Sequence, residues 1–318
     1  MMRRPRSRAR GFTLVEAIVV MVIIGIVAAM VAVFIRAPVM GYRDSVDRAE
    51  ITDQADLALR RIARDIRLAL PNSVRVSDNG AANGSRPNSA LEFLQTKSGA
   101  RYLADDDGVP NLPTLSFDDQ SQAAATNVPF TVFAPPAMFR QQVAQGDWVV
   151  VYNLGEGFEP ANAYRVPAAG QPGNIARIAA APTYTDNTPI GPVGTVVLAG
   201  NPFAAQAASQ TSPSMPSPTY SFQVVGGAVS YYCAAQPDGT LALWRAWGYG
   251  INAAQSVPGA GARAVLASRL TTCDGIFSYG SAATQRSGLV LLSLSLKGRY
   301  PDSPAIRLVH QVHVDNTP

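Results

Sequence analysis

The chain has 318 residues, of which 47% are hydrophobic and only 15% are charged. A chain of this length can bury a sizeable core without metals or many disulfides. Its formal net charge is +4, but the first eleven residues hold Arg3, Arg4, Arg6, Arg8 and Arg10, so the remainder has a net charge of −1. Because no basic patch remains outside this short leader, the composition argues against a nucleic-acid-binding body.

The first predicted element is an apolar run over residues 12–35, FTLVEAIVVMVIIGIVAAMVAVFI. As a helix it would be about 36 Å long, enough to cross a bilayer with some tilt. Arginines precede the run, so the positive-inside rule places the N-terminus in the cytoplasm and the C-terminal bulk outside. A cleaved secretory signal has a shorter apolar core, of about 7–15 residues. A plain transmembrane anchor fits the length but leaves Glu16 unexplained.

Glu16 is the one carboxylate in the apolar run. An acid in a membrane segment costs a few kcal/mol and usually marks a functional partner. If the chain is cut between Gly11 and Phe12, the new α-amine of Phe12 is a cation at the membrane edge. The amine of a neighbouring subunit would then pair with Glu16 as subunits stack. The alternative is a glutamate that snorkels to the membrane interface.

The segment RGFTLVE at residues 10–16 resembles the cleavage and methylation site of type IV prepilins and type II secretion pseudopilins. The resemblance implies that a prepilin peptidase cuts after Gly11 and N-methylates Phe12, and that Glu16 serves in assembly. It also implies other pilins or pseudopilins and an inner-membrane assembly platform as partners. Main pilins often carry a proline inside the apolar helix, whereas here Pro38 lies just beyond the run.

Beyond the apolar run, Pro38 and Gly41 predict a kink or short break. The segment from Tyr42 to Leu70 then reads as an amphipathic helix that ends at Pro71. Its apolar stripe recurs at three and four residues and comprises Ala55, Leu59, Ile62, Ile66 and Ala69. We expect this stripe to pack on a sheet. The alternative is a partner helix in a filament.

After Asn72 the pattern changes to period two, with short runs bounded by turns. Gly226-Gly227 predicts a hairpin turn, as does Pro237-Asp238-Gly239. Loops are expected at residues 77–89, 104–128, 154–192, 201–219 and 252–262, with 201–219 exposed and mobile. The candidate strands are Ser73–Val76, Ala90–Leu94, Phe130–Phe133, Asp147–Tyr152, Gly194–Leu198, Tyr220–Val225, Ala228–Cys233, Leu241–Trp247, Leu289–Leu296 and Ile306–Val314.

One long helix followed by strands predicts an α+β fold in which the helix, transmembrane and then amphipathic, packs on an antiparallel β-sheet head. The expected parts are a leader (1–11), a transmembrane and assembly helix (12–35), an amphipathic helix (36–71) and a periplasmic head (72–318). This order matches the pilin architecture. Residues 60–75 (RRIARDIRLALPNSVR) and 310–316 (HQVHVDN) further resemble the MshO group of mannose-sensitive haemagglutinin pilus biogenesis proteins.

Cys233 and Cys273 have no CxxC or Cys/His cluster around them, so a zinc site is not indicated. In an oxidising compartment the two can pair as a disulfide; the alternative is two buried free thiols. His310 and His313 are three apart in a candidate strand, which puts them on opposite faces and makes them poor joint metal ligands.

The acidic residues Asp105-Asp106-Asp107 and Asp118-Asp119 lack the spacing of an EF-hand and are expected in a solvated loop. Signatures of a nucleophile elbow, a P-loop or a dinucleotide fold are absent from the sequence. We therefore expect a protein that is not an enzyme and has no cofactor, metal or nucleic acid partner.

Together these features predict a minor pilin or pseudopilin of an MSHA-like type IV pilus. It would start as a single-pass inner-membrane protein with a periplasmic head and then enter the filament. The large head favours a low-copy or tip-located subunit, because main subunits must stack densely. The alternatives are a J-type minor pseudopilin of type II secretion and an uncleaved, single-pass periplasmic binding protein.

Overall fold

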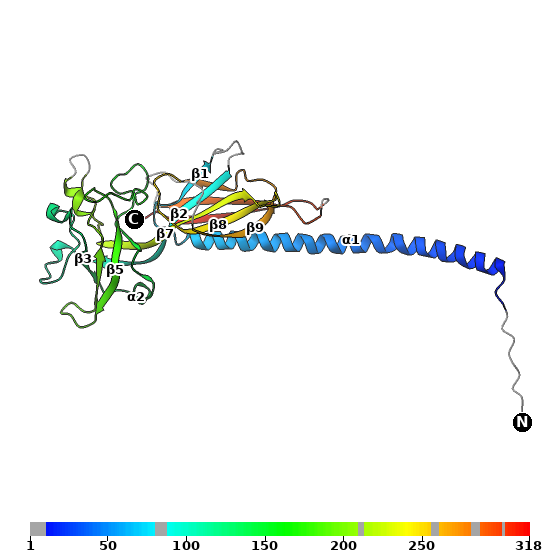
Figure 1. The fold of residues 1–318 in the computed structure, drawn as a ribbon, viewed down its shortest axis with the longest axis horizontal. Helices are drawn as coiled ribbons and strands as arrows, with labels where there is room; N and C mark the ends of the chain where they lie inside the picture. Colours follow the sequence, from blue (N-terminus) through cyan, green and yellow to red (C-terminus); the bar gives the residue numbers. More distant parts are fainter. Residues whose placement is uncertain (1–10, 80–87, 209–212, 256–260, 281–286, 301–302) are drawn as a thin grey trace, which may run out of the picture.

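The structure is a computed structural model that describes residues 11–79, 88–208, 213–255, 261–280, 287–300 and 303–318. One long helix, α1 (Leu14–Ile66), projects from a β-rich head (Figure 1). The strands are β1 (Arg75–Asn79), β2 (Asn88–Tyr102), β3 (Val128–Phe133), β4 (Trp148–Val150), β5 (Ile175–Thr185), β6 (Val193–Leu198), β7 (Ser221–Ala235), β8 (Leu241–Tyr249), β9 (Ala262–Leu270), β10 (Phe277–Gly280), β11 (Ser287–Leu296) and β12 (Ile306–Asp315). The strand pairings in the described part of the chain are antiparallel, so the predicted α+β architecture is confirmed.

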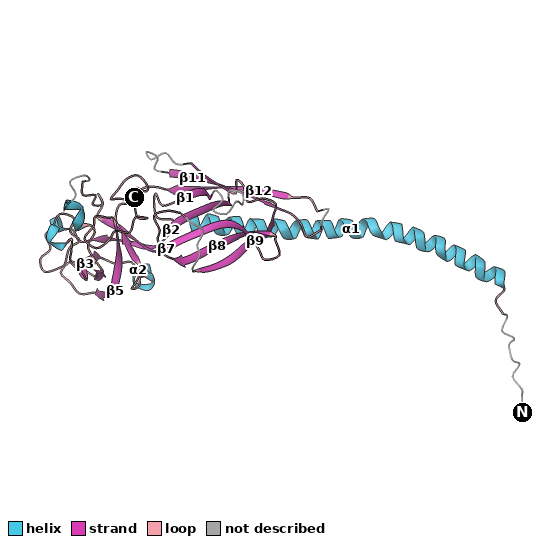
Figure 2. Cartoon of the chain, turned by 45° about the horizontal axis from the view of Figure 1, so that its top comes forward, coloured by secondary structure: helices cyan, strands magenta, loops and turns pink. Residues whose placement is uncertain are grey.

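Helix α1 is continuous through Pro38, so the predicted break between Pro38 and Gly41 is wrong. A proline removes one backbone donor and crowds the carbonyl four residues earlier, here that of Phe34. The residues on either side remain helical, and the helix curves gently instead of breaking (Figure 2). Its N-terminal part is long and apolar enough to cross a membrane, by length and composition.

The helix ends at Ile66, before the predicted end at Leu70. The chain leaves the helix there because its backbone pairs with β2: the Leu70 N–H donates to the Leu94 carbonyl at 2.8 Å, and the Thr96 N–H donates to the Leu68 carbonyl at 2.8 Å. Pro71 also disfavours a helical conformation for the residue before it. A tertiary pairing therefore sets this boundary.

The strands β2 and β7 are the longest in the head and pair with each other along most of their length, from Ala90↔Tyr232 to Arg101↔Ser221. Their two halves belong to two lobes. The lobe on α1 contains β1 and β8–β12, whereas the distal lobe contains β3–β6 and the short helix α2 (Ala137–Gln142). In Figure 1 the distal lobe lies beyond the C-terminal end of α1.

The distal lobe is a closed ring of strands. The pairings run β2–β3, β3–β6, β6–β5, β5–β4, β4–β7 and back from β7 to β2. Closure leaves the ring without a free sheet edge. Its interior is aromatic and aliphatic, with Phe130, Phe139 and Phe222 fully buried and in edge-to-face contact. The distal lobe is thus a packed unit with a core of its own.

In the other lobe the sheet curves around the C-terminal half of α1, with β9 on one side and β11 and β12 on the other (Figure 2). The predicted stripe faces this core: Ala55, Leu59, Ile62 and Ile66 are buried and Ala69 is partly buried. Packing on a sheet, the first of the two expectations for this stripe, is confirmed.

The predicted hairpin at Gly226-Gly227 is wrong, because both glycines lie within β7. The strand continues since β2 runs beside it on both sides of this point, with register shifts at Leu94/Thr96 and Thr96/Ser98. Gly227 has φ +134°, a conformation that L side chains rarely adopt. The predicted turn at Pro237-Asp238-Gly239 is confirmed: the Gly239 N–H donates to the Gln236 carbonyl at 2.9 Å between β7 and β8.

Three strands were not predicted: β5 falls in the expected loop 154–192, and β9 and β10 lie in segments left unassigned. The expectation that 201–219 is exposed is wrong for its first part, since Phe203 is fully buried against Phe117, with ring centroids 5.5 Å apart. Residues 209–212 of that segment lie outside the described residues.

Candidate processing and assembly site

The N-terminal end of α1 is built around Thr13. This residue has extended backbone angles, φ −83° and ψ 149°, and its hydroxyl accepts a hydrogen bond from the Glu16 N–H at 3.3 Å. Thr13 therefore caps the helix, and Thr-x-x-Glu is the sequence pattern of a capping box. The helix begins at Leu14, so the Gly11–Phe12 peptide bond lies in a non-helical, exposed segment, as a proteolytic site requires.

Glu16 lies in the first helical turn and is exposed. A carboxylate here interacts favourably with the backbone N–H groups of the helix N-terminus. This local role of Glu16 was not predicted; the two roles predicted from the sequence were assembly and a snorkelling side chain. The Thr-x-x-Glu spacing was the signal that could have shown it. An exposed carboxylate in this position is also free to meet a cation from another molecule.

The first half of α1 has no partner within the described chain. The most apolar stretch of the helix is not buried at all, and Phe12 is 74% exposed. Among the residues of α1 whose exposure is described, the first buried ones are Asp47 and Ile51. A continuous apolar surface of this size on a soluble monomer would be strongly unfavourable in water. Lipid tails or other apolar helices must therefore cover it.

The long N-terminal apolar helix and the antiparallel head together form an α+β architecture like that of pilins. Residues 6–32 match the family model for the prokaryotic N-terminal methylation motif, and this stretch contains Gly11, Phe12 and Glu16. The match supports a type IV prepilin-like family, whose members are processed by a prepilin peptidase and assemble with other pilins. No curated protein and no solved structure matches the chain.

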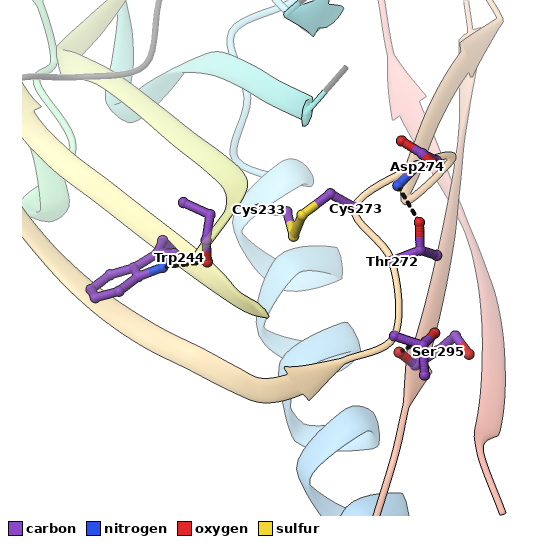
Figure 3. The surroundings of a disulfide bond; sticks show 8 residues. Cys233, Trp244, Thr272, Cys273, Asp274 and Ser295 are labelled. Atoms are coloured by element: carbon purple, nitrogen blue, oxygen red, sulfur yellow. Dashed lines mark hydrogen bonds between the residues drawn. A yellow bond between two sulfur atoms is a disulfide. The ribbon is translucent and has the colours of Figure 1, made fainter. Parts of the chain in front are cut away.

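The predicted cysteine pair lies in the head, far from the processing segment. Cys233, in β7, and Cys273, between β9 and β10, are joined as a disulfide with their Cα atoms 5.4 Å apart (Figure 3). Both are buried in the core that packs on α1. The bond ties β7 to the segment that leads into β10–β12, and these strands cover α1 from the other side.

A buried polar cluster joins the last turn of α1 to the sheet. The Asp65 carboxylate accepts hydrogen bonds from Arg245 Nε at 2.9 Å and from the Tyr231 hydroxyl at 2.6 Å, and Arg61 pairs with it at 3.3 Å. Burial, followed by the hydrogen bond to Asp65, raises the pKa of Tyr231 well above its ordinary value. Asp65 is only 3% exposed, so this charged residue belongs to the buried face of α1.

A second buried carboxylate, Asp47, holds the connection between β11 and β12. It accepts hydrogen bonds from the Ser303 hydroxyl at 2.6 Å and from the Arg299 N–H at 3.0 Å. These two hydrogen bonds, that of Ser303 first, lower the pKa of Asp47 below its ordinary value. A side chain at Gly298 would clash with this carboxylate. The spacing of Asp47 to Ile51 and Ala55 places it on the buried stripe, a signal present in the sequence.

The histidines lie as predicted, with His310 half-buried and His313 exposed on opposite faces of β12. In the acidic loop, Asp107 pairs with Arg101 at 2.6 Å and Asp106 accepts from the Tyr220 hydroxyl at 2.5 Å. Within the described ranges, no group of three or more His, Cys, Asp or Glu side chains is placed to hold a metal ion.

Proposed function

We propose that the protein is a minor pilin or pseudopilin of an MSHA-like type IV pilus and not an enzyme. The apolar half of α1 anchors it in the inner membrane, with the N-terminus cytoplasmic and the head periplasmic. A prepilin peptidase removes residues 1–11 and methylates Phe12. The single observation that carries this proposal is the GFTLVE motif at a capped, exposed helix start, followed by an apolar helix with no partner in the head.

Two features of α1 favour assembly: its uncovered apolar surface and the positive charge that cleavage creates on Phe12. The apolar surface needs cover, and a bundle of like helices provides it as well as lipid does. Cleavage creates an ammonium group on Phe12 next to the positive end of the helix dipole, where a cation is unfavourable. The carboxylate of Glu16 from a neighbouring subunit offsets that charge. Both features favour a parallel stack of helices in register.

The head supports a low-copy or terminal position. It carries a complete second lobe beyond the C-terminal end of α1 (Figure 1). Subunits that repeat along a filament must stack closely, and a lobe placed on the helix axis would meet the subunit above. A J-type pseudopilin of type II secretion would have the same anchor helix and processing motif, and it is the second candidate. If the leader is not removed, the protein would instead be a membrane-anchored periplasmic binding protein.

The deciding measurement is the intact mass and N-terminal sequence of the chain expressed with and without a prepilin peptidase. We expect loss of residues 1–11 and one added methyl on Phe12 only when the peptidase is present. The control variant Glu16→Ala should still be cleaved but should no longer enter filaments, which separates processing from assembly. An intact leader in both samples would overturn the proposal.

A further inference from the structure

Two tyrosine–arginine pairs meet where the head comes nearest to the apolar part of α1. Tyr42 and Arg43 lie on α1, and Arg299 and Tyr300 lie in the connection between β11 and β12; these four residues are called the collar below. The Arg43 guanidinium lies over the Tyr300 ring, 4.6 Å from its centroid. In Figure 1 this connection reaches further toward the N-terminal half of α1 than the rest of the head does.

The collar is held in a fixed position by Asp47. Its carboxylate accepts hydrogen bonds from the backbone N–H of Arg299 and the hydroxyl of Ser303, so Arg299 is held through its backbone while its side chain stays largely exposed. The backbone N–H of Lys297 also donates to the Arg269 carbonyl at 2.9 Å. Arg299 is therefore presented by a loop that is tied to α1 at its base, and Arg43 lies on α1 itself.

The collar lies just above the level at which α1 would leave a membrane, and long arginine side chains can reach back toward the head groups. The apolar run ends at Ile35, and Arg43 follows eight residues later, which is about 12 Å along a helix. The polar layer of a bilayer is roughly 5–7 Å thick on each side. Side chains on a helix tilt toward its N-terminus, so Tyr42 and Arg43 lean back toward that layer. Between Ile35 and Tyr42, Arg36 is exposed and charged, whereas Val39 and Met40 are exposed and apolar.

The chemistry of the collar suits phospholipid head groups. Tyr42 is 73% exposed and the Arg299 side chain is 66% exposed. Guanidinium groups bind phosphate through paired hydrogen bonds, and tyrosines are enriched at membrane interfaces. Glu50 lies 3.7 Å from Arg299 and offsets part of its charge. Among the described residues no carboxylate lies within ion-pair distance of Arg43, whose recorded partner is the Tyr300 ring.

We propose that the collar binds the phosphates of anionic phospholipids and seats the head on the outer surface of the inner membrane before assembly. The proposal rests on the membrane insertion of α1 put forward above. In this arrangement α1 would leave the bilayer at a defined angle, because the head is fixed both by the anchor and by a second contact at its base. Extraction into a filament would break that second contact.

The test uses the full chain in nanodiscs of zwitterionic lipid or of lipid containing phosphatidylglycerol, with hydrogen exchange of peptides covering residues 39–50 and 294–300 as the readout. An arginine near an anionic surface contributes about 1 kcal/mol. We therefore expect roughly fivefold slower exchange per arginine in the anionic nanodiscs. The double variant Arg43→Gln/Arg299→Gln should lose this protection, and high salt should remove it in the unchanged chain.

The matched control is Arg64→Gln, an exposed arginine on the same helix about 30 Å further from the membrane, which should keep the protection. Equal exchange in the two lipids, or an unaffected double variant, would overturn the proposal. Protection by inorganic phosphate in zwitterionic nanodiscs would show a free-phosphate site instead and would overturn it as well. Peptidase cleavage in the same nanodiscs reports separately on the proposed function, because the collar variants keep residues 10–16.

Discussion

At the scale of residues, the head depends on a few carboxylates that face inward from α1. Asp47 and Asp65 sit near the two ends of the buried stripe, and each collects donors from segments more than 160 positions away in the chain. A buried carboxylate is tolerated only when donors satisfy it. These two residues therefore fix where α1 lies against the sheet, whereas the apolar stripe fixes only which face it presents.

Replacing Asp65 should destabilise the head strongly. Asp65→Ala leaves the guanidinium of Arg245, which is 8% exposed, without its carboxylate. Removing one partner of a buried ion pair costs about 3–5 kcal/mol. Thermal unfolding of the full chain in detergent should show a large fall in Tm. The control Asp56→Ala breaks the exposed pair with Arg60 and should cost about 0.5 kcal/mol or less. Equal effects of the two variants would contradict this account.

Asp47 makes the attachment of the collar loop sensitive to acid. Its folded-state pKa is lowered, so its contribution is present above the ordinary aspartate value of 3.8 and is lost as the pH falls below it. Hydrogen exchange of residues 294–300, corrected for intrinsic rates, should accelerate below about pH 4.

The variant Asp47→Asn should show the faster exchange already at pH 6, because the amide is a weaker acceptor for the Arg299 N–H. It should then change little between pH 6 and pH 3. Persistent acid sensitivity of the same size in this variant would show that another carboxyl group is responsible.

At the scale of elements, the disulfide holds the strands that close over α1. Cys233 lies in β7 and Cys273 lies just before β10, at a sequence separation of 40. In the chain-entropy model a bond that closes a loop of this length contributes up to about 4 kcal/mol. Because the distal lobe is a separately closed ring, removing the disulfide should destabilise mainly β10–β12.

The double variant Cys233→Ser/Cys273→Ser tests whether the disulfide stabilises mainly β10–β12 and leaves the distal lobe unaffected. We expect a lower free energy of unfolding, by about 2–4 kcal/mol, and faster hydrogen exchange in residues 287–300 and 306–315. Peptides from β3 and β6 in the distal lobe serve as the internal control and should change much less. Uniform acceleration in both lobes would indicate that the head unfolds as one unit.

At the scale of the whole molecule, the long helix α1 and the two lobes of the head lie one after another along one line (Figure 1). The apolar part of α1 has no cover, the lobe on α1 wraps its second half, and the distal lobe extends past its end (Figure 1). Such a shape fits a subunit whose helix enters a bundle and whose outer lobe faces away from the membrane.

This shape predicts sparse incorporation. Antibodies against the distal lobe should label purified native filaments at few points, most of them at one end, because repeated stacking leaves little room for a lobe on the helix axis. Labelling of a main pilin along the same filaments is the control. Even labelling along the whole length by the first antibody would rule out the terminal position.

Local sequence patterns were sufficient to predict a feature wherever that feature depends on a few neighbouring residues. The N-terminal methylation motif, the apolar run, the stripe from Ala55 to Ile66 and the turn at residues 237–239 are all of this kind. Each depends on side-chain chemistry or periodicity that needs no distant partner.

The tertiary structure alone decided the rest, because strand pairing is a long-range property. An alanine-rich segment such as β5 becomes a strand only because β4 and β6 lie beside it, and Gly226-Gly227 stays extended because β2 continues past it. The helix ends at Ile66 because Leu70 pairs with Leu94. The free energy of these pairings depends on partners distant in the chain, so local propensity could not reveal them.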